Sequence, residues 1–147
     1  MNYFEIFDLP VSYSIDEDKL NANYLKKQKV LYESRDESSL LNSAYNILSD
    51  PIKRAEYFLR LNELTSDISM SSKNALEMFA LREKFDSLSD DESREKFCET
   101  LEEKISELLE SLSALENDLD AFHEKFELIW FMHSFLEKVR SNVYSGD

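Results

Sequence analysis

Few residues in this sequence could support catalytic or metal chemistry, and their spacing argues against both. Asp120 and His123 are three positions apart, so on a helix they would share a face, as in one half of a di-iron site. A second such pair is lacking. The other histidine, His133, stands beside an apolar stripe, where a hydrogen-bonded structural role is expected. Cys98 is the single cysteine, so the four ligands of a structural zinc site are not available. We expect no bound metal and no cofactor.

The sequence also lacks a phosphate-binding loop. Such loops need several glycines, and the chain has one, Gly146, near its end. We therefore predict that the protein is not an enzyme. The lone cysteine fits a reducing compartment. No apolar run is long enough to span a bilayer, and the first residues do not have the pattern of a secretory signal. We expect a cytoplasmic protein.

The charge is strongly negative and unevenly distributed. The chain of 147 residues carries a net charge of −14. Up to Leu64 there are 8 Lys and Arg against 11 Asp and Glu, and the remainder has 9 against 20. An acidic surface disfavours nucleic acid, whose binding depends on neutralised phosphates, and it disfavours an anionic membrane. We expect neither as a partner.

One glycine and two prolines leave little room for β-turns, so the chain is expected to be all-α. The central stretch, residues 41–61, shows this best. Leu41, Ala44 and Leu48 recur at helical spacing, and Pro51 ends that helix while fitting the first turn of the next. The second helix is expected to pack through apolar residues and to expose four charged ones: Lys53, Arg54, Glu56 and Arg60.

Two more helices are predicted before this stretch. Residues 3–8 suit a short helix with a large aromatic face. The next begins after a cap supplied by Ser14 or Asp16 and continues to Tyr32. The residues predicted on its buried side are Leu20, Tyr24, Leu25, Gln28, Leu31 and Tyr32. The polar residues 33–39 are predicted to form a loop.

Three helices are predicted in the second half, after a linker rich in Ser, Asp and Thr. The first, capped by Ser71 or Ser72, covers about residues 73–88. The second starts at an acidic cluster after Ser89, and its apolar positions form a coiled-coil-like seam that reaches Leu115. The third runs from Leu119 to about Val143. Three such helices can cover one another's apolar stripes as an antiparallel bundle.

Particular residues in the first half resemble a known family. The central stretch contributes Asn42, Ala44, Tyr45, Leu48, Pro51, Arg54, Ala55, Glu56, Tyr57 and Leu61. The N-terminal part contributes Asn2, Tyr3, Phe4, Phe7, Leu9, Pro10, Tyr13, Ile15, Asp16, Leu20, Tyr24, Gln28 and Tyr32. Together they resemble the J-domain of HscB co-chaperones, which serve iron-sulfur cluster assembly. The resemblance implies a J-like domain over residues 1–63, a linker over 64–71 and a C-terminal three-helix bundle over 72–147.

The resemblance also implies two protein partners, a chaperone of the DnaK or HscA type and an IscU-like scaffold. Basic residues of the second helix, Lys26, Lys27 and Lys29, would then dock the chaperone; a solvated helix face explains them equally well. The positions matching the family's scaffold-binding patch are Ala75, Leu76, Phe79, Ala80, Glu83 and Phe135. The alanines make this patch smaller and less charged than is usual in the family. Alternatively, Leu76 and Phe79 belong to the core.

The His-Pro-Asp triplet, which J-domains use to stimulate ATP hydrolysis by their chaperone, is absent from the sequence. Tyr32 is followed directly by Glu33, where the family usually continues into a loop. One hypothesis is that a flexible loop of roughly ten residues belongs between these positions and is missing from the sequence as printed. The other is a degenerate J-domain. The resemblance thus predicts a co-chaperone that delivers the scaffold and stimulates the chaperone's ATPase, with a scaffold-binding adaptor that does not activate the chaperone as the alternative.

Overall fold

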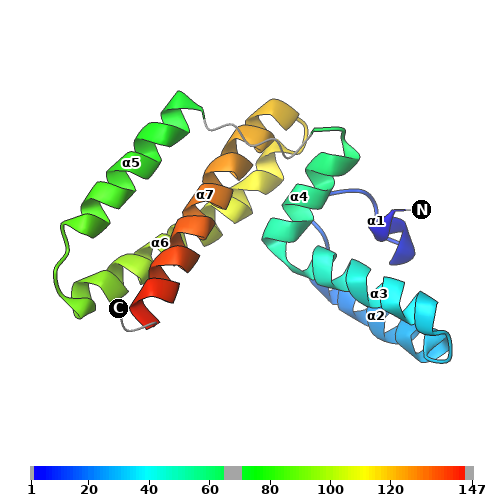
Figure 1. Cartoon of the computed structure of the whole chain (residues 1–147). Coiled ribbons are helices and arrows are strands. Elements are labelled where there is room, and N and C mark those ends of the chain that lie inside the picture. The colour runs from blue at the N-terminus through cyan, green and yellow to red at the C-terminus, as the bar shows by residue number, and fades with distance from the viewer. Residues whose placement is uncertain (1, 65–70, 145–147) are drawn as a thin grey trace. The chain divides into compact units, whose positions relative to one another are not determined.

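The computed structural model describes residues 2–64 and 71–144, and within them all regular structure is helical (Figure 1). The all-α prediction is confirmed. The chain separates into two compact units, Met1–Ser66 and Asp67–Asp147, which we call the N-terminal and C-terminal units. Most of the predicted linker, residues 65–70, lies outside the described residues.

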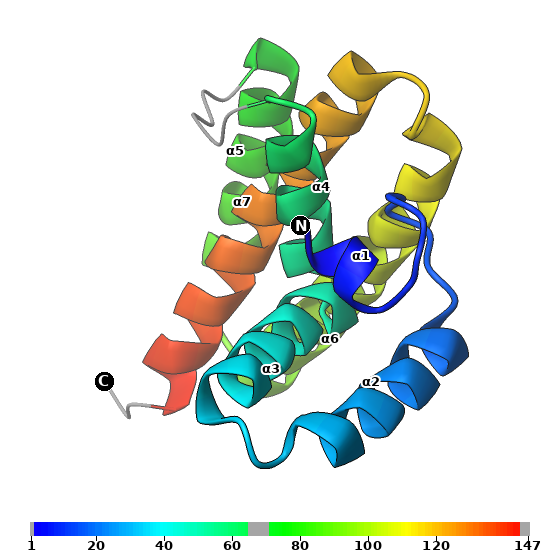
Figure 2. The ribbon, with the colours of Figure 1, turned by 90° about the vertical axis from the view of Figure 1, so that its right-hand side faces the viewer.

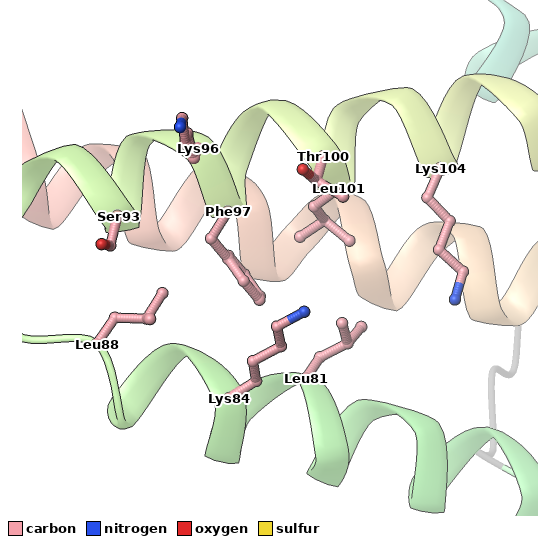
Figure 3. Close-up of a pocket in the computed structure, with 9 residues that line it drawn as sticks. All are labelled: Leu81, Lys84, Leu88, Ser93, Lys96, Phe97, Thr100, Leu101 and Lys104. Atoms are coloured by element: carbon pink, nitrogen blue, oxygen red, sulfur yellow. The ribbon is translucent and has the colours of Figure 1, made fainter.

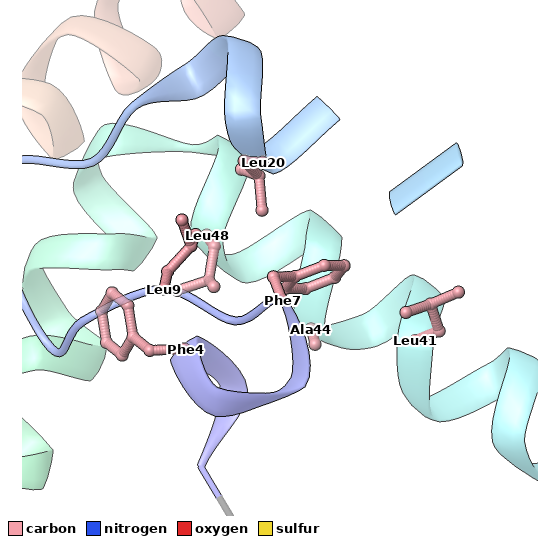
Figure 4. Packing of buried hydrophobic residues seen from close by; sticks show 7 residues of the cluster. All are labelled: Phe4, Phe7, Leu9, Leu20, Leu41, Ala44 and Leu48. Carbon is pink, nitrogen blue, oxygen red and sulfur yellow. The ribbon is translucent and has the colours of Figure 1, made fainter. Parts of the chain in front are cut away.

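The N-terminal unit contains α1 (Tyr3–Ile6), α2 (Glu17–Leu31), α3 (Arg35–Ser49) and α4 (Pro51–Leu61). Helices α2 and α3 lie side by side, as two views of the ribbon show (Figures 1 and 2). Phe7, which follows the short α1, places its ring against Tyr24 of α2 and Tyr45 of α3. The resulting core consists of Phe4, Phe7, Leu9, Leu20, Leu41, Ala44 and Leu48, all buried (Figure 4).

Local hydrogen-bonding chemistry explains where these helices begin. Of the two predicted caps of α2, Asp16 takes the role, because its carboxylate accepts the backbone N–H of Lys19 at 3.1 Å. Asp50 caps α4 in the same way, accepting the N–H groups of Ile52 and Lys53. The predicted break between α3 and α4 at Pro51 is confirmed.

The prediction of a loop over residues 33–39 is wrong. Helix α3 already begins at Arg35, so the connection between α2 and α3 consists of Tyr32, Glu33 and Ser34 alone. The acidic residues Asp36 and Glu37 fall in the first turn of α3, where the helix dipole favours negative charge. The polar residues after Ser34 therefore belong to the first turn of a helix, although their composition had suggested a loop.

The predicted buried side of α2 is also too wide. Leu20 is buried, and Tyr24 and Leu31 are partly buried, but Leu25, Gln28 and Tyr32 are exposed. Within its unit α2 packs mainly against α3, so one narrow stripe is covered. The apolar side chains outside that stripe remain in contact with solvent.

Arg54 was expected to face water, and this prediction is wrong as well. Its side chain is buried, with Nε donating to the carbonyl of Tyr13 at 2.7 Å and Nη1 donating to the carbonyl of Leu48 at 2.8 Å. The guanidinium carbon lies 4.9 Å from the centre of the Tyr13 ring. Arg54 thus joins α4 to the end of α3 and to the segment before α2.

The C-terminal unit contains α5 (Ser72–Asp86), α6 (Asp91–Ser111), the short 3-10 helix η1 (Leu112–Leu115) and α7 (Leu119–Tyr144). Ser71 caps α5 and Asp90 caps α6, each accepting the backbone N–H three residues on. Helix α6 ends earlier than its apolar seam predicted, because the last turn of that seam tightens into η1. The apolar α7 side chains buried in the core are Phe122, Phe126, Leu128, Ile129, Met132, Leu136 and Val139.

Candidate partner-binding surfaces

The basic surface of the N-terminal unit lies on α2. Lys26 and Lys29 are exposed and one helical turn apart, and the described part of the chain offers them no ion pair. Val30, on the same side, leaves 76% of its surface exposed. Lys27 points elsewhere, since its Nζ lies 3.6 Å from Oδ2 of Asp8. The structure therefore brings together two of the three predicted lysines.

Sequence reasoning missed the apolar component of this surface. Leu25 was predicted on the buried side of the helix, and Val30 was not considered. Both are exposed beside the lysines. Lys19 was missed too, although it lies seven residues before Lys26 and hence on the same helix face. The signal that could have identified it is this two-turn spacing. Basic and apolar side chains thus share one face of α2.

The second surface is the outer side of α5. Leu76 is 71% exposed and Phe79 is 60% exposed, and both come from a helix whose core contact is made by Met78 and Asn74. The other predicted α5 residues, Ala75, Ala80 and Glu83, are also exposed. Their spacing places these five residues on one helix face. Neither Leu76 nor Phe79 belongs to the core, so the structure excludes the alternative in which both are packing residues.

Phe135 of α7 adds an aromatic cluster at the α5 and α7 contact. Its ring meets those of Phe85 and Phe97 nearly at right angles, with centroids 6.0 and 6.4 Å away. The guanidinium carbon of Arg82 lies 5.8 Å from the centre of the Phe135 ring. Phe135 is consequently half-buried and held in place, and it is less accessible than the α5 residues with which it was grouped.

The ionisable groups first considered for chemistry do not assemble into a site. Among the described residues no three His, Cys, Asp or Glu side chains come close enough to hold a metal ion. Nε2 of His133 lies 3.1 Å from Oε1 of Glu137 on the same helix. Nε2 of His123 is buried with no hydrogen-bond partner among the described residues. Burial raises the pKa of the Cys98 thiol, which keeps it neutral and poorly nucleophilic.

One ion pair links α6 to α7. Nη2 of Arg140 donates to Oε2 of Glu102 at 2.8 Å. This hydrogen bond, and then the positive charge of Arg140, lower the pKa of the Glu102 carboxyl. The Asp90 carboxyl has a lowered pKa for a related reason, since the hydroxyl and backbone N–H of Ser93 both donate to it. Asp90 thus caps α6, and the pair of Arg140 with Glu102 joins α6 to α7.

The connection between α2 and α3 is too short to present a loop of the J-domain kind. Ser34 donates its backbone N–H to the carbonyl of Leu31, and the Ser38 hydroxyl donates to the same carbonyl at 2.6 Å. These bonds close the turn directly onto the end of α2. The described helices also include none with the length and apolar character needed to cross a membrane.

Comparison with known proteins finds relatives among the HscB homologs. No protein-family model matches the sequence. The "Co-chaperone protein HscB homolog" of Acinetobacter baylyi is 32% identical over 120 residues, which cover 76% of this chain and 70% of that protein. The homolog of the same name from Haemophilus influenzae is 42% identical over 74 residues, covering 42% of each chain. The crystal structure of human co-chaperone protein HscB superposes with a TM-score of 0.82 at 20% identity, covering 97% of this chain and 82% of that one, which shows a shared fold.

The matched regions are longer in the relatives than in this chain. In the Haemophilus influenzae comparison, 42% of 147 residues is about 62, whereas the match has 74 positions, so about a dozen positions have no counterpart here. The same arithmetic for Acinetobacter baylyi, 76% of 147 against 120 positions, leaves about eight. These percentages count the unmatched positions without placing them in the chain, so a loop missing between α2 and α3 stays a hypothesis.

Proposed function

This chain belongs to the HscB family of co-chaperones, and from that premise we propose that it binds an IscU-like scaffold protein and delivers it to a chaperone of the DnaK or HscA type, stimulating the chaperone's ATPase. The family acts in iron-sulfur cluster assembly. The observation that carries the proposal is the pair Leu76 and Phe79, which stay exposed on a helix that reaches the core through other residues, Asn74 and Met78. Large apolar side chains gathered on one exposed face are typical of a binding surface.

We place the scaffold on the α5 face. Ala75 and Ala80 are small, so a partner can approach the helix closely beside Leu76 and Phe79. Glu83 supplies a negative charge one turn beyond Phe79, and Phe135 borders the face from α7. In such interfaces a few residues, often aromatic, carry most of the binding energy, while a charge at the rim sets orientation and the rate of association.

We place the chaperone on the α2 face. Lys26 and Lys29 offer two ammonium groups that pair with no carboxylate of the described residues, and Val30 adds apolar surface beside them. An acidic patch on the chaperone would be attracted at long range by the lysines and would then pack on the apolar side chain. Because the scaffold and chaperone faces belong to different units, one molecule can hold both partners at once. Their effective concentration then rises without any direct contact between them.

A second candidate is an adaptor that binds the scaffold without activating the chaperone. It is favoured by the absence of the His-Pro-Asp triplet and by the three-residue connection between α2 and α3. Both candidates bind the scaffold through α5. They differ in a single property, the rate at which the chaperone hydrolyses ATP when protein and scaffold are present. Neither candidate involves catalysis by this chain itself.

Isothermal titration of the scaffold into wild-type protein and into Phe79→Ala tests the shared part of the proposal. Truncation of an interface anchor typically costs more than 1 kcal/mol, so the affinity should fall by about fivefold or more. Leu25→Ala is the matched control, since Leu25 is an exposed leucine of α2 outside the α5 face. Equal affinities for wild type and Phe79→Ala would refute the assignment of the scaffold to α5.

A further inference from the structure

A groove runs between α5 and α6 on a different side of α5 from the scaffold face. One hollow of about 340 Å³ has an apolar floor made by Leu81, Leu88, Phe97 and Leu101 (Figure 3). The main helix contact of α5 is with α7, so α6 leaves this space open. None of the six residues proposed for the scaffold lines it.

A second hollow of about 400 Å³ extends the groove, and Lys104 of α6 lines both. Its apolar lining comes from Leu108, Leu115 and Leu128. On α5 the lining residues of both hollows fall at helical spacing between Lys73 and Lys84, so they form one stripe, and Leu88 follows the end of the helix. Eleven steps of 1.5 Å make this stripe about 16 Å long, roughly three helical turns.

The charge of the groove is opposite to that of the unit around it. From residue 65 onward the chain has 9 Lys and Arg against 20 Asp and Glu. Five of those nine line the groove: Lys73, Lys84, Lys96, Lys104 and Lys125. The acidic residues that line it are Glu77 and Glu124. No ion pair joins these five lysines to any carboxylate within the described residues.

The lysines are distributed along the groove. In the close-up, Lys84 and Lys104 extend into the space between the helices, whereas Lys96 points away from α5 (Figure 3). From Lys96 to Lys104 the rise along α6 is about 12 Å. A ligand with a single acidic group would need lysines at only one end of the groove. Positive charge spread over several turns fits a ligand with acidic groups at intervals along its length.

We propose that this groove is a second docking site, which takes an acidic amphipathic helix of a partner protein. The leucines of that helix would pack on the apolar floor at spacings of three and four residues, and its carboxylates would pair with the lysines on both walls. Such a helix would complete a four-helix arrangement with α5, α6 and α7. The site goes beyond the scaffold and chaperone surfaces and shares no residue with them.

The test uses the full-length chain and two labelled probes in fluorescence anisotropy. The first is a stapled helical peptide of 18 residues with leucines at helical spacing and glutamates elsewhere. The second has lysines in place of the glutamates. We expect the glutamate probe to bind at least ten times more tightly than the lysine probe, and more weakly as salt is added. Equal binding of the two probes would overturn the proposal.

Two charge reversals locate the probe. Lys104→Glu should weaken the glutamate probe about fivefold, since it removes one charge pair and adds a repulsion. Lys138→Glu, an equal charge change at an exposed α7 position outside the groove, should have a much smaller effect. Identical effects of the two reversals, or loss of probe binding in Phe79→Ala, would overturn the assignment. So would a dimer in sedimentation that Lys104→Glu dissociates, because a second copy would then be the occupant.

Discussion

Replacement of Arg54 by methionine should unfold the N-terminal unit selectively. The variant keeps the bulk of the side chain but removes two charged donors, leaving the buried carbonyls of Tyr13 and Leu48 without the bonds that Arg54 supplies. A hydrogen bond from a charged group contributes about 1.5 to 3 kcal/mol, and the contact with the Tyr13 ring adds up to about 1 kcal/mol. Since the two bonds are not additive, we expect a loss of about 3 to 4 kcal/mol in the free energy of unfolding.

That loss is large for a unit of this size, whose whole stability is of the order of 5 kcal/mol. Urea unfolding should be followed with two signals. Far-UV circular dichroism reports both units, and fluorescence of Trp130, the single tryptophan, reports the C-terminal unit alone. In Arg54→Met an early transition should appear in the dichroism, while the fluorescence transition stays at its wild-type midpoint.

Arg60→Met is the matched control, because Arg60 lies on the same helix, is exposed and, among the residues that the structure describes, pairs only with Glu56, at 3.2 Å. An exposed pair of this spacing contributes less than about 0.5 kcal/mol. If Arg54→Met costs no more than Arg60→Met, the bonds to the two carbonyls do not hold the unit together, and the reasoning is refuted.

Three further predictions concern caps, charge and the thiol. Asp50→Ala should cost about 1 kcal/mol in urea unfolding, because two N–H groups at the start of α4 lose their acceptor. Glu102→Gln should lower stability at pH 7 by less than about 1 kcal/mol, since the pair with Arg140 is largely exposed. The Glu102 carboxyl has a lowered pKa in the folded state, so its contribution is present above the ordinary carboxyl range and should vanish as the pH falls through the folded value; a difference from wild type that persists at about pH 2 would contradict this. Cys98 should react with Ellman's reagent much more slowly in native protein than in urea, because it is buried and its pKa is raised; equal rates would show that the helix pair opens readily.

The helix boundaries that the sequence predicted well depend on contacts between neighbours in the chain. Asp50 and Pro51 start α4 through a cap and a fixed φ, and Ser71 and Asp90 start the next two helices in the same local way. Such interactions reach two or three residues, so the sequence contains all that is needed to infer them. The all-helical fold followed from the same spacing rules.

The predictions that failed depend on contacts between distant segments. Arg54 is charged and stands among polar neighbours, so nothing nearby indicates that Tyr13, 41 residues earlier, and the end of α3 enclose it. Leu25 and Tyr32 continue an apolar pattern, yet they are exposed because the unit provides only enough partners to cover one stripe of α2. Burial is decided by the area of the neighbouring helices, which periodicity alone does not give.

The same difference between local and long-range contacts explains which candidate surfaces could be predicted. An excess of apolar residues on α5 was visible in the sequence, and the structure shows that Leu76 and Phe79 are the exposed ones. The lysine-lined groove was not visible, because Lys84 and Lys104 belong to different helices that are far apart in the sequence. Only the packing of α5 beside α6 brings their side chains to one opening. Whether either surface binds the proposed partner stays a prediction.

The central claim is that this chain acts as a co-chaperone, and single-turnover ATP hydrolysis by the partner HscA-type chaperone tests it most directly. The rate should be measured with scaffold present, with and without this protein. We predict acceleration that is reduced when Lys26 and Lys29 are both replaced by glutamate. An unchanged rate, under conditions in which titration shows the scaffold bound, would contradict co-chaperone activity and leave a scaffold-binding adaptor.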